Sequence, residues 1–408
     1  MSAPSQPLYV RLANHLGTGL AGAGLDIPAL EAERLLSRAS RKTGLNDFGD
    51  DSFREGLTRL VDGLNHEAQL SQVGRIVAHY NLVDHLCVRL RLVDYRKHRS
   101  EVAQQSIERP VFILGLPRTG TTILFELLGQ DPAMRSPASW EVAKPLPPPI
   151  ANTYNNDKRR RQVARLLPVM EKLAPGFRRI HAIDAHLPQE CVYLLASHFM
   201  SEQFAYMYNL PSYRQWLLEA DMGPAYRWHR DFLQHLQVDC PGDHWVLKSP
   251  AHLAYLHTLL AQYPDACIVW THRRPLDAMA SFSSLTSTLH GGFSDRVDAR
   301  ATAEQEVSHY AGVLQAGLAQ RQQIGDAQVL DVGFGDICDD PVAVIDRIYD
   351  HFNLRLSTDA RQAMAHYLRQ RPRDLHGKHD YSASRFGLHP DIESGYFGAY
   401  LDRFSAYM

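Results

Sequence analysis

The sequence predicts an α/β fold in which a parallel β-sheet is flanked by helices. From residue 109 onward, short β-rich apolar runs alternate with longer helical patterns, which is typical of parallel strands joined by helices. The runs are apolar without a break, as expected for strands that are buried on both faces. We therefore predict a helical N-terminal region over residues 1–108 and an α/β domain over residues 109–408, with a helical insertion at about 150–240.

The N-terminal region carries a helical pattern and no strand-like alternation. In "IPALEAERLLSRASRKTG", Leu30, Leu35, Leu36 and Ala39 repeat near the helical period, and the pattern ends at Gly44. The stretches "DDSFREGLTRLVDGLNHEAQL" and "VGRIVAHYNLVDHLCVRLRLVDY" continue the pattern. We assign no chemistry to this region.

The α/β domain is expected to contain four strands and the helices between them. The strands are "PVFILGL", "HWVLKS", "ACIVWTHR" and "AQVLDVGF". After the insertion, helices are expected at about 276–288, 300–324, 341–352, 358–371 and 391–405. "PLPPPI", at 145–150, is expected to form a stiff connector.

Charge and hydropathy exclude several classes of protein. The 43 basic and 45 acidic side chains nearly cancel, which argues against a nucleic-acid-binding scaffold. No apolar run approaches the ~18 residues of a transmembrane helix, and "MSAPSQPLYVRLANHL" lacks the basic start and long apolar run of a signal peptide. These features predict a cytoplasmic protein. The five cysteines include no C-x-x-C pair and are expected to be reduced thiols.

The histidines give little indication of a metal site. They number 21 but are scattered along the chain. His376 and His379 are spaced like two metal ligands, yet no further cluster completes a site. We predict that the protein holds no metal.

The stretch "GLPRTGTT", residues 115–122, follows the apolar run "PVFIL" and precedes the helical pattern "ILFELLGQ". Gly115 and Gly120 are spaced as in a nucleotide phosphate loop, where backbone N–H groups and a helix N-terminus hold phosphates. Thr121 stands where that loop carries lysine, and Arg118 supplies a cation from the middle of the loop. The loop is therefore suited to a short anionic group without a γ-phosphate.

A second anion site is expected in "WTHRRPLDAMASF". The strand "ACIVW" is followed by Arg273 and Arg274, Pro275 suits the first turn of a helix, and Ser281 lies in its early turns. An arginine fork, a hydroxyl and a helix start together hold a terminal phosphate well. The alternative is a surface salt bridge formed by Arg273.

Two anion sites on one parallel sheet indicate a nucleotide that is phosphorylated in two places. "PVFILGLPRTGTTILFELLGQDP", "HWVLKSPAHL" and "ACIVWTHRRPLDAMASF", in this order and spacing, resemble the sulfotransferase family, whose members use 3′-phosphoadenosine 5′-phosphosulfate (PAPS). The resemblance covers about residues 109–404. It implies a phosphate-loop type of fold, and transfer of a sulfo group from PAPS to a hydroxyl of a small-molecule or lipid acceptor without a metal.

The resemblance also implies which residues contact the nucleotide. The 3′-phosphate is assigned to Arg273 and Ser281, and Lys248 matches the lysine that contacts the sulfonate and the bridging oxygen. "GKHDYSASRFGL" resembles the segment that closes over the nucleotide in related bacterial members, where Lys378 adds a 3′-phosphate contact or is a solvated loop lysine. The loop that holds the 5′-phosphosulfate consists of Arg118, Thr119, Gly120, Thr121 and Thr122.

The chain departs from the cytosolic members of the family at three positions. They have lysine at the position of Arg118, whereas this chain has arginine there, like the tyrosylprotein and many bacterial branches. They place a tryptophan that stacks on adenine where this chain has Ile123, so adenine must be held otherwise. Their catalytic histidine lies two residues after the lysine, where this chain has Pro250.

Three residues are candidates for the general base that sulfo transfer requires. Glu141, in "SPASWEVAKPLPPP", resembles the acidic base that follows the same helix in the tyrosylprotein branch, and is the first candidate. His252 follows the lysine strand by four residues. Glu190, in "AHLPQECVYLL", lies at a helix start, where capping is the alternative role. Arg118 and Lys248 are suited to stabilising charge on the bridging oxygen.

The acceptor is harder to identify from the sequence. The aromatic-rich stretch 198–217 and Trp228 either line a pocket for a large apolar alcohol or form helix core. "DKRRRQ", at 157–162, is either a solvated helix face or a contact with an anionic membrane. A kinase and a non-catalytic nucleotide-binding protein are the alternative functions, and the sequence leaves the oligomeric state open.

Overall fold

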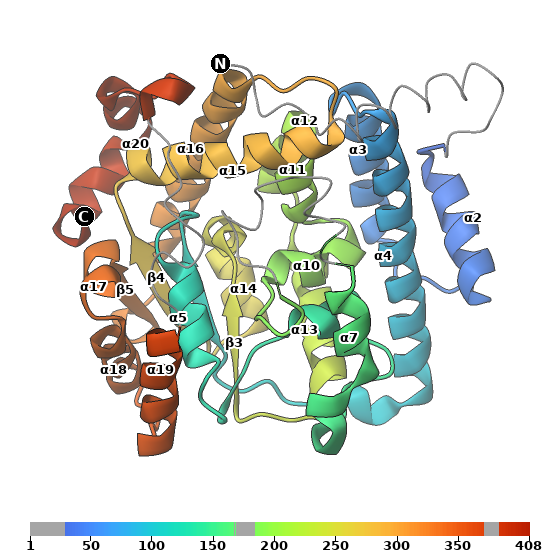
Figure 1. Cartoon of the computed structure of the whole chain (residues 1–408), viewed down its shortest axis with the longest axis horizontal. Helices are drawn as coiled ribbons and strands as arrows, with labels where there is room; N and C mark the ends of the chain where they lie inside the picture. The colour runs from blue at the N-terminus through green and yellow to red at the C-terminus, as the bar shows by residue number, and fades with distance from the viewer. Residues whose placement is uncertain (1–28, 167, 169–183, 371–382) are drawn as a thin grey trace.

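The structure is a computed structural model that describes residues 29–166, 168, 184–370 and 383–408 (Figure 1). Five parallel strands form one sheet in the order β2-β3-β1-β4-β5. The strands are β1 (Val111–Gly115), β2 (Met134–Arg135), β3 (His244–Lys248), β4 (Cys267–His272) and β5 (Val329–Gly333). The α/β fold predicted from the sequence is confirmed.

The sheet is buried on both faces, as the continuous apolar runs predict. Along β1, Val111 and Ile113 pack into one hydrophobic cluster, whereas Phe112 and Leu114 pack into the other. This alternation follows from the two-residue period of a strand. All five residues of β1 are buried, so the loop that follows Gly115 starts from a rigid base.

The helices of the α/β domain divide between the two faces. The smaller cluster covers one face and draws on α5 (Thr121–Leu128), α17 (Phe334–Asp339), α18 (Pro341–His351) and α19 (Thr358–Gln370). The larger cluster covers the other face and draws on α14 (Leu256–Gln262), α15 (Pro275–Phe293), α16 (Ala299–Arg321) and α20 (Pro390–Phe404). These bounds confirm the helices predicted after the insertion. In Figure 1, α15 crosses above the sheet and α17 to α20 lie together at one end.

The N-terminal helices pack at the opposite end of the molecule (Figure 1). They are α2 (Ala32–Thr43), α3 (Phe53–His66) and α4 (Gln72–His98). Gly44 ends α2 with a φ of +74°, as the sequence predicts. Their apolar residues join the same larger cluster as Phe112 of the sheet. The division of the chain at residue 108 stays a prediction.

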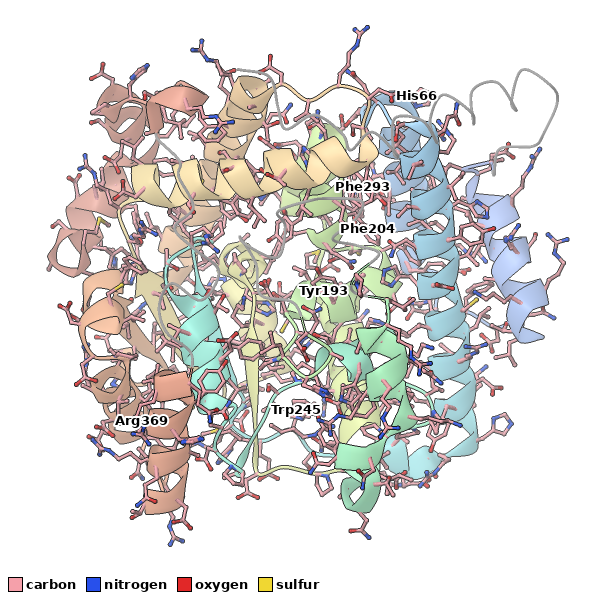
Figure 2. All side chains as sticks on the ribbon, viewed as in Figure 1. His66, Tyr193, Phe204, Trp245, Phe293 and Arg369 are labelled. Atoms are coloured by element: carbon pink, nitrogen blue, oxygen red, sulfur yellow. The ribbon has the colours of Figure 1, made fainter. Side chains whose placement is uncertain are left out.

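The inserted segment adds helices between the first and the third strand. Among the described residues between β2 and β3, the α-helices are α6 (Ser139–Ala143), α7 (Lys158–Ala164), α10 (Cys191–Leu195), α11 (Gln203–Met207), α12 (Pro211–Glu219) and α13 (Gly223–Gln237). Figure 2 shows the interior beside them filled with side chains, among them Tyr193, Phe204 and Phe293, which belong to or pack against the larger cluster. The aromatic-rich stretch 198–217 therefore contributes substantially to the core.

Two further sequence predictions meet the structure here. All five cysteines are free thiols, as expected: Cys87, Cys191, Cys240, Cys267 and Cys338. Among the helices that the structure describes, none is long and apolar enough to cross a membrane. The cytoplasmic location stays a prediction.

Candidate active site

The loop between β1 and α5 has a backbone that few residues other than glycine adopt readily. Gly115 has a φ of +148° and Gly120 a φ of +86°. A Cβ on Gly115 would lie 2.4 Å from the Thr271 hydroxyl oxygen, so the close approach of β1 to β4 requires glycine there. Arg118 also has a positive φ, of +70°, which is uncommon for a side chain of this size. Such strain at a loop is typical of functional sites.

The loop threonines have different surroundings. Thr119 is fully buried, and its hydroxyl donates to the Leu116 carbonyl at 2.6 Å and lies 2.6 Å from the Thr271 hydroxyl. These contacts hold the loop against β4, so the Thr119 hydroxyl fits a structural role better than the nucleotide contact that we expected. Thr121 and Thr122 form the first residues of α5, where backbone N–H groups lack intrahelical partners.

Arg118, Arg273 and Ser281 come together although they derive from two separate motifs. The Arg118 Nε donates to the Ser281 Oγ at 3.1 Å. The Arg273 Nη1 donates to the Arg118 carbonyl at 2.8 Å. The two predicted anion sites therefore adjoin each other at the carboxyl ends of β1 and β4, which are neighbours in the sheet. Their nucleotide contacts stay predictions.

Phe334, the first residue of α17, belongs to this site and was not identified from the sequence. The guanidinium of Arg273 lies over the Phe334 ring, 4.2 Å from its centroid. A Cβ on Gly120 would also lie 3.3 Å from this ring. Phe334 directly follows β5, so its position after a strand end was the one available signal.

Arg274, which neighbours Arg273 in the chain, has a different partner. Its Nε donates to Glu393 of α20 at 2.8 Å. The same carboxylate accepts from the backbone N–H of Leu276, in the first turn of α15, at 2.9 Å. Glu393 thereby stabilises the start of α15 through a hydrogen bond and through the helix dipole. Pro275 begins this helix, as predicted.

Lys248 lies at the carboxyl end of β3, beside β1. It pairs with Ile113 in the sheet register, and its Nζ lies 5.9 Å from the centre of the Phe125 ring on α5. The Nζ donates to the Glu190 Oε1 at 2.5 Å, and both side chains are largely buried. Glu190 occupies the position just before α10, but its side chain makes no capping hydrogen bond. The geometry therefore favours contact with Lys248 over capping for Glu190.

Glu141 is fully buried in α6. Its Oε1 accepts from Arg135 Nη2 at 2.6 Å. Its Oε2 accepts from the backbone N–H of Ala138 at 2.7 Å and from the Tyr154 hydroxyl at 3.2 Å. Burial raises the pKa of the Glu141 carboxyl, and the Arg135 charge opposes this shift. Its role as a base stays a prediction, but these contacts fit a structural role better.

His252 lies in the 3₁₀ helix η4 (Pro250–Tyr255), which packs against β1 on the larger-cluster face. It is fully buried, and its Nδ1 shares a hydrogen bond of 2.7 Å with the Tyr226 hydroxyl. Its ring lies edge-on to Phe112, with centroids 5.1 Å apart. Burial holds its pKa well below the ordinary value. Its catalytic role is untested, and these surroundings are those of a core residue.

Lys378, His376 and His379 lie outside the residues that the structure describes, so the predictions for them stay open. Within the described ranges, no group of three or more His, Cys, Asp or Glu side chains is arranged to hold a metal ion.

Residues 110–358 match the sulfotransferase family, and this stretch is more than half of the chain. The chain belongs to the sulfotransferase family. The matched stretch contains both anion sites, Lys248 and all three candidate bases.

Solved structures of this family show the same fold over almost the whole chain. Sulfotransferase STF1 from Mycobacterium tuberculosis H37Rv is 32% identical with a TM-score of 0.82, and the match covers 92% of this chain and 100% of that one. Sulfotransferase STF9 from Mycobacterium avium is 29% identical with a TM-score of 0.84, and the match covers 93% and 98%.

A curated relative carries a name that specifies an acceptor. The omega-hydroxy-beta-dihydromenaquinone-9 sulfotransferase Stf3 of Mycobacterium bovis and of Mycobacterium tuberculosis is 25% identical over 266 residues, or 60% of this chain. The chain covers 63% of the length of these curated relatives.

Proposed function

We propose that this member of the sulfotransferase family transfers a sulfo group from PAPS to the hydroxyl of a lipid or another large apolar alcohol. The arrangement of Arg118, Ser281 and Arg273 supports the donor most directly, because it places two arginines and a hydroxyl beside the start of α5. This set of groups matches a nucleotide with anionic groups at two positions. It fits ATP less well, since Thr121 stands where a lysine would reach a γ-phosphate.

Each group has a separate task in the proposed reaction. Arg118, the α5 N-terminus and Lys248 bind the 5′-phosphosulfate, and Arg273 with Ser281 binds the 3′-phosphate. Lys248 lies between the loop helix and Glu190, because it contacts both the Phe125 ring and the Glu190 carboxylate. It is therefore suited to stabilising negative charge on the oxygen that leaves sulfur.

Glu190 is the base that the described contacts favour. Its carboxylate is largely buried, touches Lys248 and is not engaged in a helix cap. In the proposed step, the acceptor oxygen bonds to sulfur while the sulfur–oxygen bond to the 5′-phosphate breaks. The acceptor proton passes to Glu190, and 3′-phosphoadenosine 5′-phosphate leaves with the electron pair of the broken bond.

The acceptor class is supported by the curated relative, whose name gives an omega-hydroxylated dihydromenaquinone. Tyr193 and Tyr206 are half-buried aromatic residues, and the charge of Glu190 adds to the burial that raises the pKa of each phenol. Aromatic groups beside the candidate base are suited to an apolar alcohol.

A transfer assay with PAPS labelled in its sulfo group tests this function. The purified protein is incubated with the labelled donor and a short-tailed ω-hydroxylated dihydromenaquinone, and label is expected in the organic phase as a sulfate ester. A parallel thermal-shift series compares 3′-phosphoadenosine 5′-phosphate with ATP. Stabilisation by ATP alone would support the kinase alternative, and stabilisation by the 3′-phosphorylated nucleotide without transfer to any hydroxyl would support a non-catalytic binding protein.

A further inference from the structure

We propose, on the basis of the proposed sulfo transfer, that Glu141 is a positioning residue that holds Glu190 against Lys248. A series of contacts leads from the Glu141 carboxylate to Glu190: one hydrogen bond from a backbone N–H to that carboxylate, then backbone hydrogen bonds between two segments. Glu141 fixes the turn at Ala138, this turn binds the segment 185–189, and Glu190 follows that segment directly.

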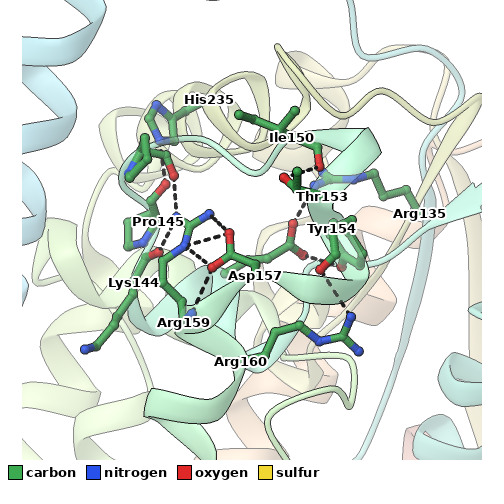
Figure 3. Close-up of polar contacts among 12 residues, drawn as sticks. Arg135, Lys144, Pro145, Ile150, Thr153, Tyr154, Asp157, Arg159, Arg160 and His235 are labelled. Atoms are coloured by element: carbon green, nitrogen blue, oxygen red, sulfur yellow. Dashed lines mark hydrogen bonds and ion pairs between the residues drawn. The ribbon is translucent and has the colours of Figure 1, made fainter.

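The first part of this series of contacts is a buried ionic cluster at the edge of the sheet. Arg135 ends β2, and its guanidinium lies over the Trp245 ring of β3 at 4.3 Å from the centroid. It donates to Glu141, which also accepts from Tyr154. Glu141 is fully buried and Arg135 nearly so, so each ion needs the other in this environment. Figure 3 shows Arg135 and Tyr154 within this cluster.

A second arginine, Arg159, holds the part of this segment that follows Glu141. Arg159 is ion-paired with Asp157 at 2.6 Å and donates to the Lys144 and Pro147 carbonyls (Figure 3). Its guanidinium lies over the Trp140 ring at 4.7 Å from the centroid. The segment from β2 through α6 to α7 is therefore held from both sides, which makes it a rigid support.

The second part of the series of contacts joins this support to the residues before Glu190. The Ser139 N–H donates to the Leu187 carbonyl at 3.0 Å, and the Trp140 N–H donates to the Ala185 carbonyl at 3.1 Å. In the reverse direction, the Gln189 N–H donates to the Pro137 carbonyl at 2.7 Å. These bonds surround an antiparallel bridge between Ala138 and Pro188. The Ala138 N–H is the group that Glu141 itself binds, so the carboxylate fixes the centre of this bridge.

The last part of the series of contacts is the ion pair between Glu190 and Lys248. Glu190 follows Gln189 and extends its carboxylate to the Lys248 Nζ at 2.5 Å. The charge of Glu190 also acts on Cys191, Tyr193 and Tyr206, where it adds to the burial that raises the pKa of each group. A displacement of about 1 Å at a reacting group is enough to cost ~10²-fold in rate, so support from the Glu141 cluster matters for catalysis.

The test compares single-turnover rates against pH for the full-length protein, with saturating PAPS and the short-tailed ω-hydroxylated dihydromenaquinone. Glu141→Gln is expected to lower the rate roughly 10–10²-fold with an unchanged KM for PAPS. The acidic limb of the profile, which reports protonation of the base, is expected to persist, because Glu190 is still present in this variant.

Asp131→Asn is the matched control. Asp131 is also a buried carboxylate that accepts from a backbone N–H, of Ala133, and from a tyrosine hydroxyl, of Tyr349. Loss of the Asp131 carboxylate should lower the stability of the protein without lowering the single-turnover rate. Tyr154→Phe removes a single donor from Glu141 and should give a smaller effect of the same kind, which keeps the test valid if Glu141→Gln fails to fold.

The outcomes separate this role from the others. Loss of the acidic limb in Glu141→Gln would make Glu141 the base itself, and an unchanged rate with only lower stability would reduce it to a structural residue; either result overturns the proposal. Full activity of Glu190→Gln would instead refute Glu190 as the base. A crystal structure of Glu141→Gln gives a readout without turnover: the pair between Lys248 and Glu190 should open beyond the ~3.5 Å limit of a hydrogen bond. An intact 2.5 Å pair would contradict the proposal.

Discussion

Lys248 and Glu190 form an ion pair, with 2.5 Å between Nζ and Oε1, that joins the carboxyl end of β3 to the residue just before α10. The pair brings together the cation proposed to stabilise the leaving oxygen and the carboxylate proposed to accept the proton. Lys248 has to serve two anions when the donor binds, since the sulfonate is expected at the same ammonium. Binding of the donor is therefore expected to alter the contact between Lys248 and the proposed base, Glu190.

Replacing Glu190 by glutamine is expected to lower the single-turnover rate by roughly 10²–10⁴, which is the usual contribution of a general base. The affinity for 3′-phosphoadenosine 5′-phosphate should stay equal or increase, because Lys248 no longer has a competing carboxylate. Rapid-quench measurements at saturating PAPS give the rate, and calorimetry gives the affinity. His252→Asn serves as the comparison, and a larger loss of rate in that variant than in Glu190→Gln would assign the base to His252.

Arg273→Ala is expected to weaken binding of 3′-phosphoadenosine 5′-phosphate by about 1.5–3 kcal/mol, because it removes a charge-assisted hydrogen bond. AMP lacks the 3′-phosphate, so its affinity should change much less. Calorimetry with both nucleotides measures the difference. Arg274→Ala is the matched control, since this neighbouring arginine contacts Glu393 and is more than half exposed. Equal losses for the two nucleotides in Arg273→Ala would refute the 3′-phosphate assignment.

Sulfo transfer is expected to continue in the presence of EDTA. We expect Arg118, Lys248 and the N–H groups at the start of α5 to supply the positive charge that the sulfonate needs, without a divalent cation. Initial rates measured with EDTA, with added magnesium and with neither should agree. A rate that disappears with EDTA and returns with magnesium would favour the kinase alternative.

The sequence predicted those parts of the site that are encoded by neighbouring residues. Gly115, Arg118 and Gly120 form a local motif, and Arg273, just after β4, lies eight positions before Ser281 on the next helix, α15. Their adjacency follows from the sheet, because β1 and β4 are parallel neighbours whose carboxyl ends meet. The fold was predictable for the same reason, since each of its longer strands is mostly apolar.

The remaining parts depend on contacts between distant segments. Lys248 and Glu190 are 58 positions apart, and the position of Glu190 before a helix indicated a cap equally well. The Thr119 hydroxyl shares a hydrogen bond with the hydroxyl of Thr271 on another strand, and no local sequence pattern predicts this contact. β2 has two residues, too few for a periodic signal, yet it places Arg135 beside Glu141. Glu141 was the first candidate base because of its place after a helix, and burial against Arg135 is a property of the tertiary structure alone.

Acidification below pH 6.5 is expected to destabilise the protein through its buried histidines. His198, His229 and His235 lie in the core, and burial lowers their pKa values to about 3, 3 and 4. In the unfolded chain each histidine titrates near ~6.5, so the unfolded state binds more protons than the folded state below that pH. The stability is therefore fully present above pH 6.5 and decreases as the pH falls toward 3–4, by about 1 kcal/mol per histidine at one pH unit below 6.5.

Urea denaturation at pH 7.5 and 5.5 measures this loss of stability. The variant His235→Gln shows how much of the loss comes from His235. The His235 Nε2 lies 2.9 Å from the Pro145 carbonyl, and a glutamine amide can donate to the same oxygen without titrating. The variant should therefore lose about 1 kcal/mol less stability between the two pH values than the native protein does. His257→Gln, at an exposed position in α14, is the control and should leave the difference unchanged. Identical pH dependence in the native protein and in His235→Gln would show that His235 accepts a proton without unfolding.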